Sequence, residues 1–208
     1  MKWCKVGKLV NVPAMTALRK EESRFYTEEE FLAGKDQLPD ASYEFVDGRI
    51  YAMSYASDKH EFVAGNIFAR LHGHLRGKKC RAFKGGMLVR LKMLGRVINY
   101  LPDVMVACDE RTGNRLYREE PLAIFEVLSP STQAIDQREK LLAYGTIPSL
   151  RHYIILHQDR IALMHMKRSG ETWEETFVTD PEAPVELPEI GFSMRVADIY
   201  DEIDFTAE

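Results

Sequence analysis

The chain has 208 residues, of which 45% are hydrophobic and 29% are charged. This length and balance exclude a disordered or fibrous protein and fit one globular domain with a proper core. No apolar run approaches the roughly 20 residues of a membrane span, and the basic N-terminus has no apolar signal region. We therefore expect a cytoplasmic protein with no membrane partner, in which residues 1–24 are a loosely attached extension and residues 25–208 form one domain.

Charge is distributed unevenly along the chain, although the formal net charge of −4 argues against a protein that coats nucleic acid. Residues 62–102 contain no acidic residue, whereas Arg195 is the only basic residue between positions 171 and 208. Such segregation fits a side that faces a polyanion, and it also fits a solvated surface whose opposite charges meet in the fold. The basic residues of the acid-free stretch are Arg70, Arg76, Lys78, Lys79, Arg81, Lys84, Arg90, Lys92 and Arg96.

The three cysteines, Cys4, Cys80 and Cys108, are scattered along the chain. Their odd number and the lack of a C-x-x-C pair imply neither a zinc site nor a disulfide framework. A reducing compartment is the default for such a sequence.

A short helix and a hairpin are expected near the N-terminus. Thr27 with Glu30 three residues later predicts a capping box. Asp47-Gly48, between two strand-like runs, predicts a tight two-residue turn. Glu44 lies in the first of these strands among aromatic residues, and composition favours a solvent-facing position for it.

A longer helix is expected over residues 57–75, where apolar residues recur at helical spacing. Ser57 or Asp58 can cap it. His60 falls on the apolar side of its first turn, where a hydrogen-bonded core histidine is commoner than a ligand.

Two short, continuous apolar runs dominate the second half of the chain, at residues 100–108 and 121–128. Such runs are typical of central strands that are covered on both faces. Strands separated by a helix favour parallel pairing, so we expect an α/β fold with a mixed β-sheet flanked by helices. The other elements expected here are a strand at 87–92, a polar loop at 109–120, a helix at 136–144, strands at 150–156 and 161–166, and a short helix at 195–203.

Each central strand carries one carboxylate, Asp103 in the first and Glu126 in the second. A lone ionised carboxylate in an apolar strand costs several kcal/mol unless a positive group meets it. Two on adjacent strands repel each other unless a divalent cation lies between them. The pattern therefore predicts a metal site built from Asp103 and Glu126.

Short motifs surround these carboxylates: Pro102-Asp103, Phe125–Thr132, Arg138–Tyr144 and Ile147–Tyr153, with Tyr43–Gly48, Met53-Ser54 and His60 upstream. Together they resemble the Uma-type endonuclease family of the PD-(D/E)XK, restriction-endonuclease-like superfamily. The resemblance covers about residues 27–199. It implies a restriction-endonuclease-like mixed sheet flanked by helices and a metal-dependent endonuclease, a hydrolase that cuts the phosphodiester bonds of DNA.

The resemblance also implies roles for individual residues. Asp103, Glu126 and the backbone carbonyl of Val127 would hold magnesium or manganese, which prefer oxygen ligands. Glu44 would be an accessory catalytic residue, as a ligand or through a water. Basic residues between positions 70 and 96 would hold the DNA backbone, and a homodimer would suit double-strand cleavage.

One position departs from the superfamily pattern. Two residues after Glu126, where the superfamily has a catalytic lysine, this chain has Leu128. In the family a lysine of the following helix takes over, and Lys140 occupies that place. The alternative for Lys140 is a surface pair with Asp136, worth only tenths of a kcal/mol.

Two other classes of function stay open at this point. One is a non-cleaving module of nuclease fold that binds DNA or a protein partner. The other is a structural dimer whose buried carboxylates pair with Arg90 or Lys92. Metal-dependent stabilisation and turnover distinguish these classes from a nuclease, because fold alone does not.

Overall fold

The computed structural model describes residues 24–34, 42–53, 56–109, 116–128 and 136–206. The helices within these residues are α1 (Glu28–Gly34), α2 (Asp58–Leu75), α3 (Asp136–Gly145), the 3-10 helix η3 (Pro188–Ile190) and α4 (Val196–Ile199). The strands are β1 (Tyr43–Val46), β2 (Arg49–Ala52), β3 (Arg81–Lys84), β4 (Leu88–Met93), β5 (Arg96–Tyr100), β6 (Val104–Ala107), β7 (Tyr117–Arg118), β8 (Pro121–Leu128), β9 (His152–His157), β10 (Leu163–Ser169), β11 (Thr172–Val178), β12 (Pro184–Leu187) and β13 (Phe192–Arg195).

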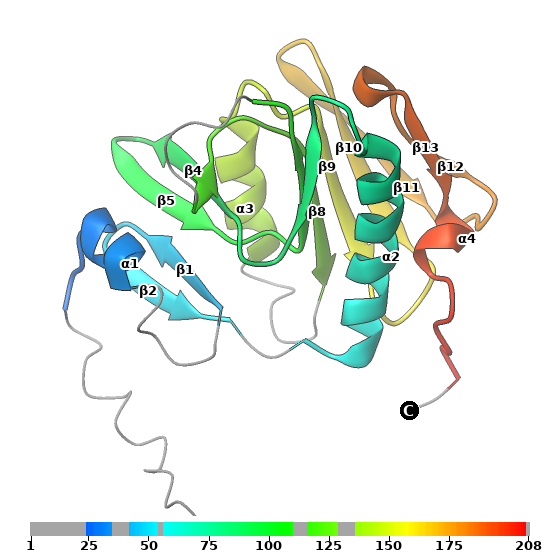
Figure 1. Ribbon diagram of the computed structural model, residues 1–208, viewed down its shortest axis with the longest axis horizontal. Helices are drawn as coiled ribbons and strands as arrows, with labels where there is room; N and C mark the ends of the chain where they lie inside the picture. The colour runs from blue at the N-terminus through cyan, green and yellow to red at the C-terminus, as the bar shows by residue number, and fades with distance from the viewer. Residues whose placement is uncertain (1–23, 35–41, 54–55, 110–115, 129–135, 207–208) are drawn as a thin grey trace, which may run out of the picture.

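A six-stranded sheet forms the centre of the described structure, in the order β11-β10-β9-β8-β6-β3 (Figure 1). β8 and β9 are parallel and lie on either side of α3 in the chain. The other neighbours in this sheet are antiparallel. The expected mixed sheet, with a parallel pair across a helix, is therefore confirmed.

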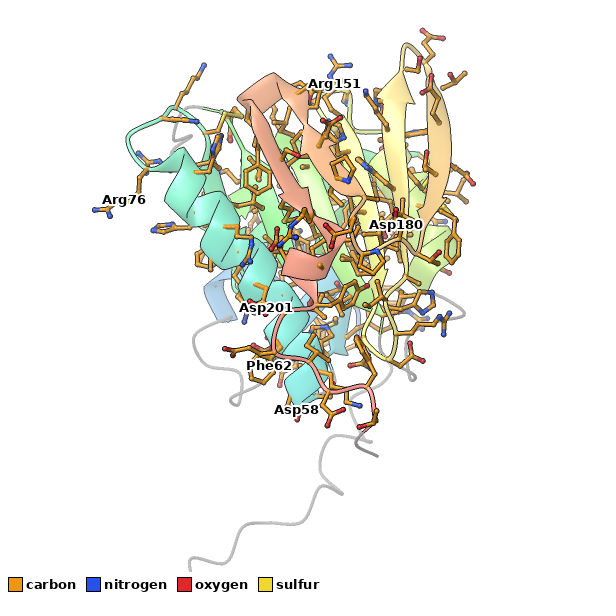
Figure 2. The ribbon with its side chains drawn as sticks, turned by 90° about the vertical axis from the view of Figure 1, so that its right-hand side faces the viewer. Asp58, Phe62, Arg76, Arg151, Asp180 and Asp201 are labelled. Atoms are coloured by element: carbon orange, nitrogen blue, oxygen red, sulfur yellow. A yellow bond between two sulfur atoms is a disulfide. The ribbon has the colours of Figure 1, made fainter. Side chains whose placement is uncertain are left out.

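One face of this sheet is covered by α2, which lies beside the β12–β13 ribbon and α4 (Figure 2). Val63, Ile67 and Leu71 form the buried stripe of the helix, and they belong to the same core as Phe125 and Val127 of β8. The expected helix is confirmed, since the Ser57 side chain caps α2 by accepting a hydrogen bond from the His60 N–H.

The other face packs against α3 and a five-stranded sheet of order β2-β1-β5-β4-β7. Tyr144 of α3 is fully buried there with Ile124 and Leu128 of β8. Side chains alternate along a strand, so Glu126, between Ile124 and Leu128, lies on this α3 face.

The local predictions near the N-terminus are confirmed. The Thr27 N–H donates to Glu30 Oε2 at 2.8 Å, and the Glu30 N–H donates to Thr27 Oγ1 at 3.1 Å. Asp47 and Gly48 have φ values of 49° and 85°, as a primed two-residue hairpin turn requires.

The run at residues 100–108 is two strands rather than one. β5 ends at Tyr100 and β6 begins at Val104. Pro102 has no N–H to donate, and the Leu101 N–H donates to Glu44 Oε1 rather than to a strand. The strand therefore breaks just before Asp103, whose carbonyl still accepts a hydrogen bond from the Gly85 N–H at 3.2 Å.

Two further differences have local causes. The loop expected at 109–120 contains β7, which pairs in parallel with β4. The last helix ends at Ile199 rather than near position 203. The amide of Asn66 accounts for this early end, because it donates to the carbonyls of Ile199 and Asp201.

Cys80 and Cys108 form a disulfide, so the expectation that no disulfide is present was wrong. β3 and β6 are antiparallel, and Arg81 pairs with Ala107. This register places the two cysteines opposite each other just beyond the paired residues. Their spacing could not show it, because the pairing of these two strands was not predicted. In the described residues no helix is long and apolar enough to cross a bilayer.

Candidate active site

Asp103 and Glu126 come from antiparallel neighbours, β6 and β8. The register pairs Val104 with Phe125, and one further step along both strands brings Asp103 beside Glu126. The carboxylate of Asp103 accepts a hydrogen bond from the Val127 N–H at 2.7 Å. The two carboxylates that the sequence singled out therefore lie side by side at one end of the central sheet.

Lys140 projects from α3 into this group. Its Nζ lies 2.9 Å from Glu44 Oε1 and 3.3 Å from Glu126 Oε1, and only 6% of the side chain is exposed. The ammonium also lies 5.4 Å from the centre of the Tyr100 ring. The alternative partner, Asp136, has a side chain outside the described residues. The ammonium thus lies between two buried glutamates, while Leu128 is buried in the core.

Glu44 is buried, so the solvent-facing interpretation of this residue was wrong. Its Oε1 accepts the Leu101 N–H at 3.1 Å in addition to meeting Lys140. Pairing of β1 with β5 within the five-stranded sheet brings this glutamate beside the end of β5. Composition could not show this, because the partners of Glu44 are far away in sequence.

Two further side chains complete the group. His60 Nε2 lies 3.3 Å from Asp103 Oδ2, while Nδ1 is buried with no hydrogen-bond partner among the described residues. The Tyr144 hydroxyl donates to Glu126 Oε1 at 3.1 Å. Sequence reasoning placed His60 on the core side of α2 but did not find Tyr144. Tyr144 lies one helical turn after Lys140 on α3, and this spacing is the signal that could have identified it.

The charges of this group act strongly on one another. Burial raises the pKa of Glu126 to about 8; the Lys140 charge lowers it, and the charges of Asp103 and Glu44 raise it. Burial lowers the pKa of Lys140, but the charges of Glu126 and Glu44 outweigh burial and the pKa is raised. For His60, burial lowers the pKa and the contact with Asp103 raises it by more. Lys140 is therefore an ammonium ion, and burial together with the charges of Asp103 and Glu44 disfavours loss of the Glu126 proton, so a cation that entered the group would favour the ionised form of Glu126.

The chain is similar to a known protein family. The family model Uma2, described as "Putative restriction endonuclease", matches residues 28–197. The chain belongs to the Uma2 family. Two uncharacterized Synechocystis proteins are similar to it. One, slr1290, is 28% identical over 181 residues and covers 85% of this chain and 92% of its own length. The other, sll1609, is 27% identical over 169 residues, and the match covers 79% of this chain and 94% of the length of sll1609.

A crystal structure from Anabaena variabilis, described as a putative nuclease, shares the fold of this Uma2 chain. The TM-score is 0.66 with 17% sequence identity, and the match covers 84% of this chain and 97% of the other. At this identity the likeness shows the fold alone. The restriction-endonuclease-like α/β architecture expected from the sequence is confirmed.

The oxygen donors of this Uma2 chain fit a magnesium or manganese ion in their chemistry. Among the described residues, no three His, Cys, Asp or Glu side chains are arranged as ligands of one ion. Magnesium, however, is commonly held by one or two carboxylates and keeps several waters. Asp103, Glu126 and the Val127 carbonyl would supply such a set.

Several cations of the acid-free stretch meet acids in the fold. Arg90 binds Glu28 at 2.6 Å and Glu119 at 2.5 Å, so the structural-dimer hypothesis assigned Arg90 the wrong partners. The solvated-surface interpretation accounts for this and the other pairs. These are Arg70 with Asp198, Lys84 with Glu61, and Arg96 with Asp47.

Proposed function

We propose that this Uma2 protein is a metal-dependent DNA endonuclease that hydrolyses phosphodiester bonds. The observation that carries the proposal is the buried Lys140 ammonium, which contacts Glu44 and Glu126 beside Asp103. A lysine next to paired carboxylates is what the superfamily chemistry needs, and here it comes from α3 instead of position 128.

Each residue has a role in this proposal. Asp103, Glu126 and the Val127 carbonyl would hold magnesium or manganese, which when bound lowers the pKa of a water and polarises a phosphate oxygen. Lys140 would orient the attacking water or stabilise charge that develops on the phosphate. Glu44 would hold the ammonium of Lys140 in place.

The remaining contacts would keep the acidic residues oriented. His60 and the Val127 N–H both meet Asp103 Oδ2, at 3.3 Å and 2.7 Å. The Tyr144 hydroxyl of α3 donates a hydrogen bond to Glu126 of β8. These partners limit the rotamers of both carboxylates, which is how positioning residues support a site.

The test is incubation of the protein with supercoiled, linear and branched DNA, with magnesium, with manganese and with a chelator. We expect cleavage that needs the metal and is lost in Asp103→Asn. Asp201→Asn, a change at an exposed aspartate just after α4, is the control and should cut like the wild type. Metal-independent cutting, or equal cutting by Asp103→Asn, would contradict the proposal.

DNA binding without turnover in every metal condition would instead identify the non-cleaving module. The homodimer remains a prediction, which sedimentation of the protein with and without a DNA duplex would test. Confinement to the cytoplasm likewise remains a prediction.

A further inference from the structure

A second concave site lies at the other end of β6. The cavity measures about 430 Å³ and is lined by Lys78, Lys79, Arg81, Phe83, Asp109 and Arg118, together with Ala107. This volume lies within the range of small-molecule sites. Asp103 and Asp109 are six residues apart along an extended chain, so the cavity is roughly 20 Å from the candidate active site.

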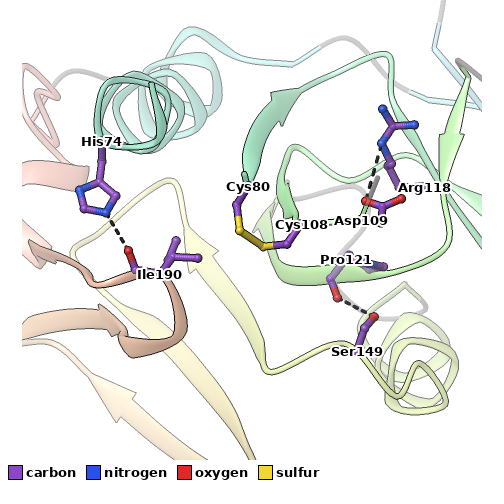
Figure 3. The surroundings of a disulfide bond; sticks show 8 residues. All are labelled: His74, Cys80, Cys108, Asp109, Arg118, Pro121, Ser149 and Ile190. Carbon is purple, nitrogen blue, oxygen red and sulfur yellow. Dashed lines mark hydrogen bonds and ion pairs between the residues drawn. A yellow bond between two sulfur atoms is a disulfide. The ribbon is translucent and has the colours of Figure 1, made fainter. Parts of the chain in front are cut away.

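The inner wall of the cavity is built from two buried, charged side chains. Arg118 is 8% exposed and Asp109 is 7% exposed, and Arg118 Nε lies 3.9 Å from Asp109 Oδ1 (Figure 3). The Arg118 guanidinium also lies over the Phe83 ring, 5.1 Å from its centre. Burying an arginine and an aspartate costs free energy unless polar partners meet them.

One atom of this wall has an unused hydrogen-bonding capacity. Asp109 Oδ1 is buried and has no hydrogen-bond partner among the described residues. At 3.9 Å its approach to Arg118 is too long for a hydrogen bond. Buried carboxylate oxygens are normally satisfied, so this oxygen is available to a hydroxyl or amino donor that enters the cavity.

The outer wall carries cations that acids do not neutralise. Within the described residues, Lys78 Nζ contacts no carboxylate and lies 2.8 Å from Nε2 of the His74 ring. Neither Lys79 nor Arg81 has an ion-pair partner within the described part of the chain, although other cations of the acid-free stretch are paired. Among the described residues that line the cavity, cations therefore outnumber the single carboxylate, Asp109, and the cavity attracts anions.

The disulfide joins the two segments that form this cavity. Cys80 lies between Lys79 and Arg81, and Cys108 lies next to Asp109. Cys80 and Cys108 pack against the core on the α2 face, whereas Phe83 packs on the α3 face. The covalent link thus lies behind the cavity and holds its walls without filling it, which favours a preformed site.

We propose that this cavity binds a nucleotide, either a free mononucleotide or the 5′-phosphorylated end of a nucleic acid. Lys79, Arg81 and Arg118 would hold the phosphate through charge-assisted hydrogen bonds. Asp109 would accept a hydrogen bond from a sugar hydroxyl or a base amino group. The site is separate from the carboxylate group of Asp103 and does not depend on cleavage.

The test is calorimetric titration of the full chain, in the presence of a metal chelator, with adenosine 5′-monophosphate, ribose 5-phosphate and inorganic phosphate. We expect the nucleotide to bind more tightly than inorganic phosphate. The double variant Lys79→Ala/Arg81→Ala should bind the nucleotide at least tenfold more weakly, because two charged hydrogen bonds are lost. Arg76→Ala, at an exposed arginine just upstream and outside the cavity, is the matched control and should bind like the wild type.

Asp109→Ala tests the class of ligand. It should leave the affinity for inorganic phosphate unchanged or higher, because a negative charge is removed, while the advantage of the nucleotide over phosphate disappears. A 5′-phosphorylated dinucleotide, compared with its 5′-hydroxyl form, identifies the source of the phosphate. If it binds and the double variant loses it, the ligand is a strand end; if only the mononucleotide binds, the ligand is a free nucleotide.

Two results would overturn the proposal. One is no nucleotide binding by the wild type at millimolar concentration. The other is wild-type affinity in the double variant with an unchanged melting temperature. Because binding is measured in a chelator, where no metal-dependent cleavage occurs, an absence of nucleotide binding and an absence of DNA cleavage are distinguished from each other.

Discussion

At the start of β6, two buried glutamates hold the ammonium of Lys140 and Asp103 contacts His60, whereas at its end Asp109 lies among cations that include Arg118. Both ends place a carboxylate near a buried cation. Acidic residues outnumber basic ones at the start of the strand, and basic residues outnumber acidic ones at its end. The acidic end favours an added cation, and the basic end favours an added anion. The two ends of one strand thus differ in charge, since the elements packed beside each end supply the remaining charges.

Lys140→Ala should give the largest effect at the acidic end. We expect cleavage to fall at least 100-fold, as for loss of a charged group that stabilises a transition state. The variant should also lose about 3–5 kcal/mol of stability, because Glu44 and Glu126 are left buried without their cation. Initial rates on supercoiled DNA and urea denaturation measure the two effects.

A second variant separates chemistry from folding here. Lys140→Ala/Glu44→Gln should recover much of the lost stability, since one buried charge is removed, but none of the cleavage. Lys167→Ala, at an exposed lysine of β10, is the control for both measurements. Cutting at the wild-type rate by Lys140→Ala would show that this lysine only neutralises its neighbours.

Reducing the disulfide should give a large effect on stability that concerns the basic end. The link joins residues separated by 28 positions, and a loop of that size is worth about 3.5 kcal/mol in the chain-entropy model. We expect the free energy of unfolding of Cys80→Ser/Cys108→Ser to fall by about that amount in denaturant. Cys4→Ser, at the remaining cysteine, is the control. Equal stability of the wild type with and without a reductant would contradict the presence of the bond in solution.

The pH dependence of stability probes the acidic end without any metal. The folded pKa of Glu126 is raised to about 8, above an ordinary value of 4.5. Its contribution is therefore complete below pH 4.5 and is lost as the pH rises to about 8, at up to about 1.4 kcal/mol per unit. Glu126→Gln cannot lose a proton, so its stability relative to the wild type should increase across this window.

Denaturation at pH 5, 6.5 and 8 in a chelator makes this measurement. Glu186→Gln, at an exposed glutamate of β12, is the control and should follow the wild type at each pH. A constant difference between Glu126→Gln and the wild type would mean that Glu126 is ionised throughout.

Metal-dependent stabilisation should give the smallest effect. A magnesium or manganese concentration ten times the dissociation constant stabilises the folded state by about 1.4 kcal/mol. Asp103→Asn should weaken this response by removing a ligand charge. Thermal melts over a metal titration test this, with calcium-free buffer and Asp201→Asn as the control. A melting temperature that stays constant in both proteins would contradict a metal site at the acidic end.

The sequence alone determined the features that depend on neighbouring residues. The Thr27 capping box, the Asp47-Gly48 turn and the apolar stripe of α2 follow from local hydrogen bonding and helical periodicity. The continuous apolar runs identified β8 and the region of β6 as buried strands, and one carboxylate in each marked the candidate site. The parallel pair across α3 followed from chain order.

Only the tertiary structure decided which distant segments meet. The burial of Glu44, the contact of His60 with Asp103 and the Cys80–Cys108 bond all join residues from elements whose pairing no local pattern encodes. The same holds for the basic cavity, where β3 and β6 meet Arg118 of β7. Local propensities act over a few residues, whereas burial and charge balance depend on the packing of the whole chain. For that reason the sequence located the carboxylates, and the fold determined the charges that surround them.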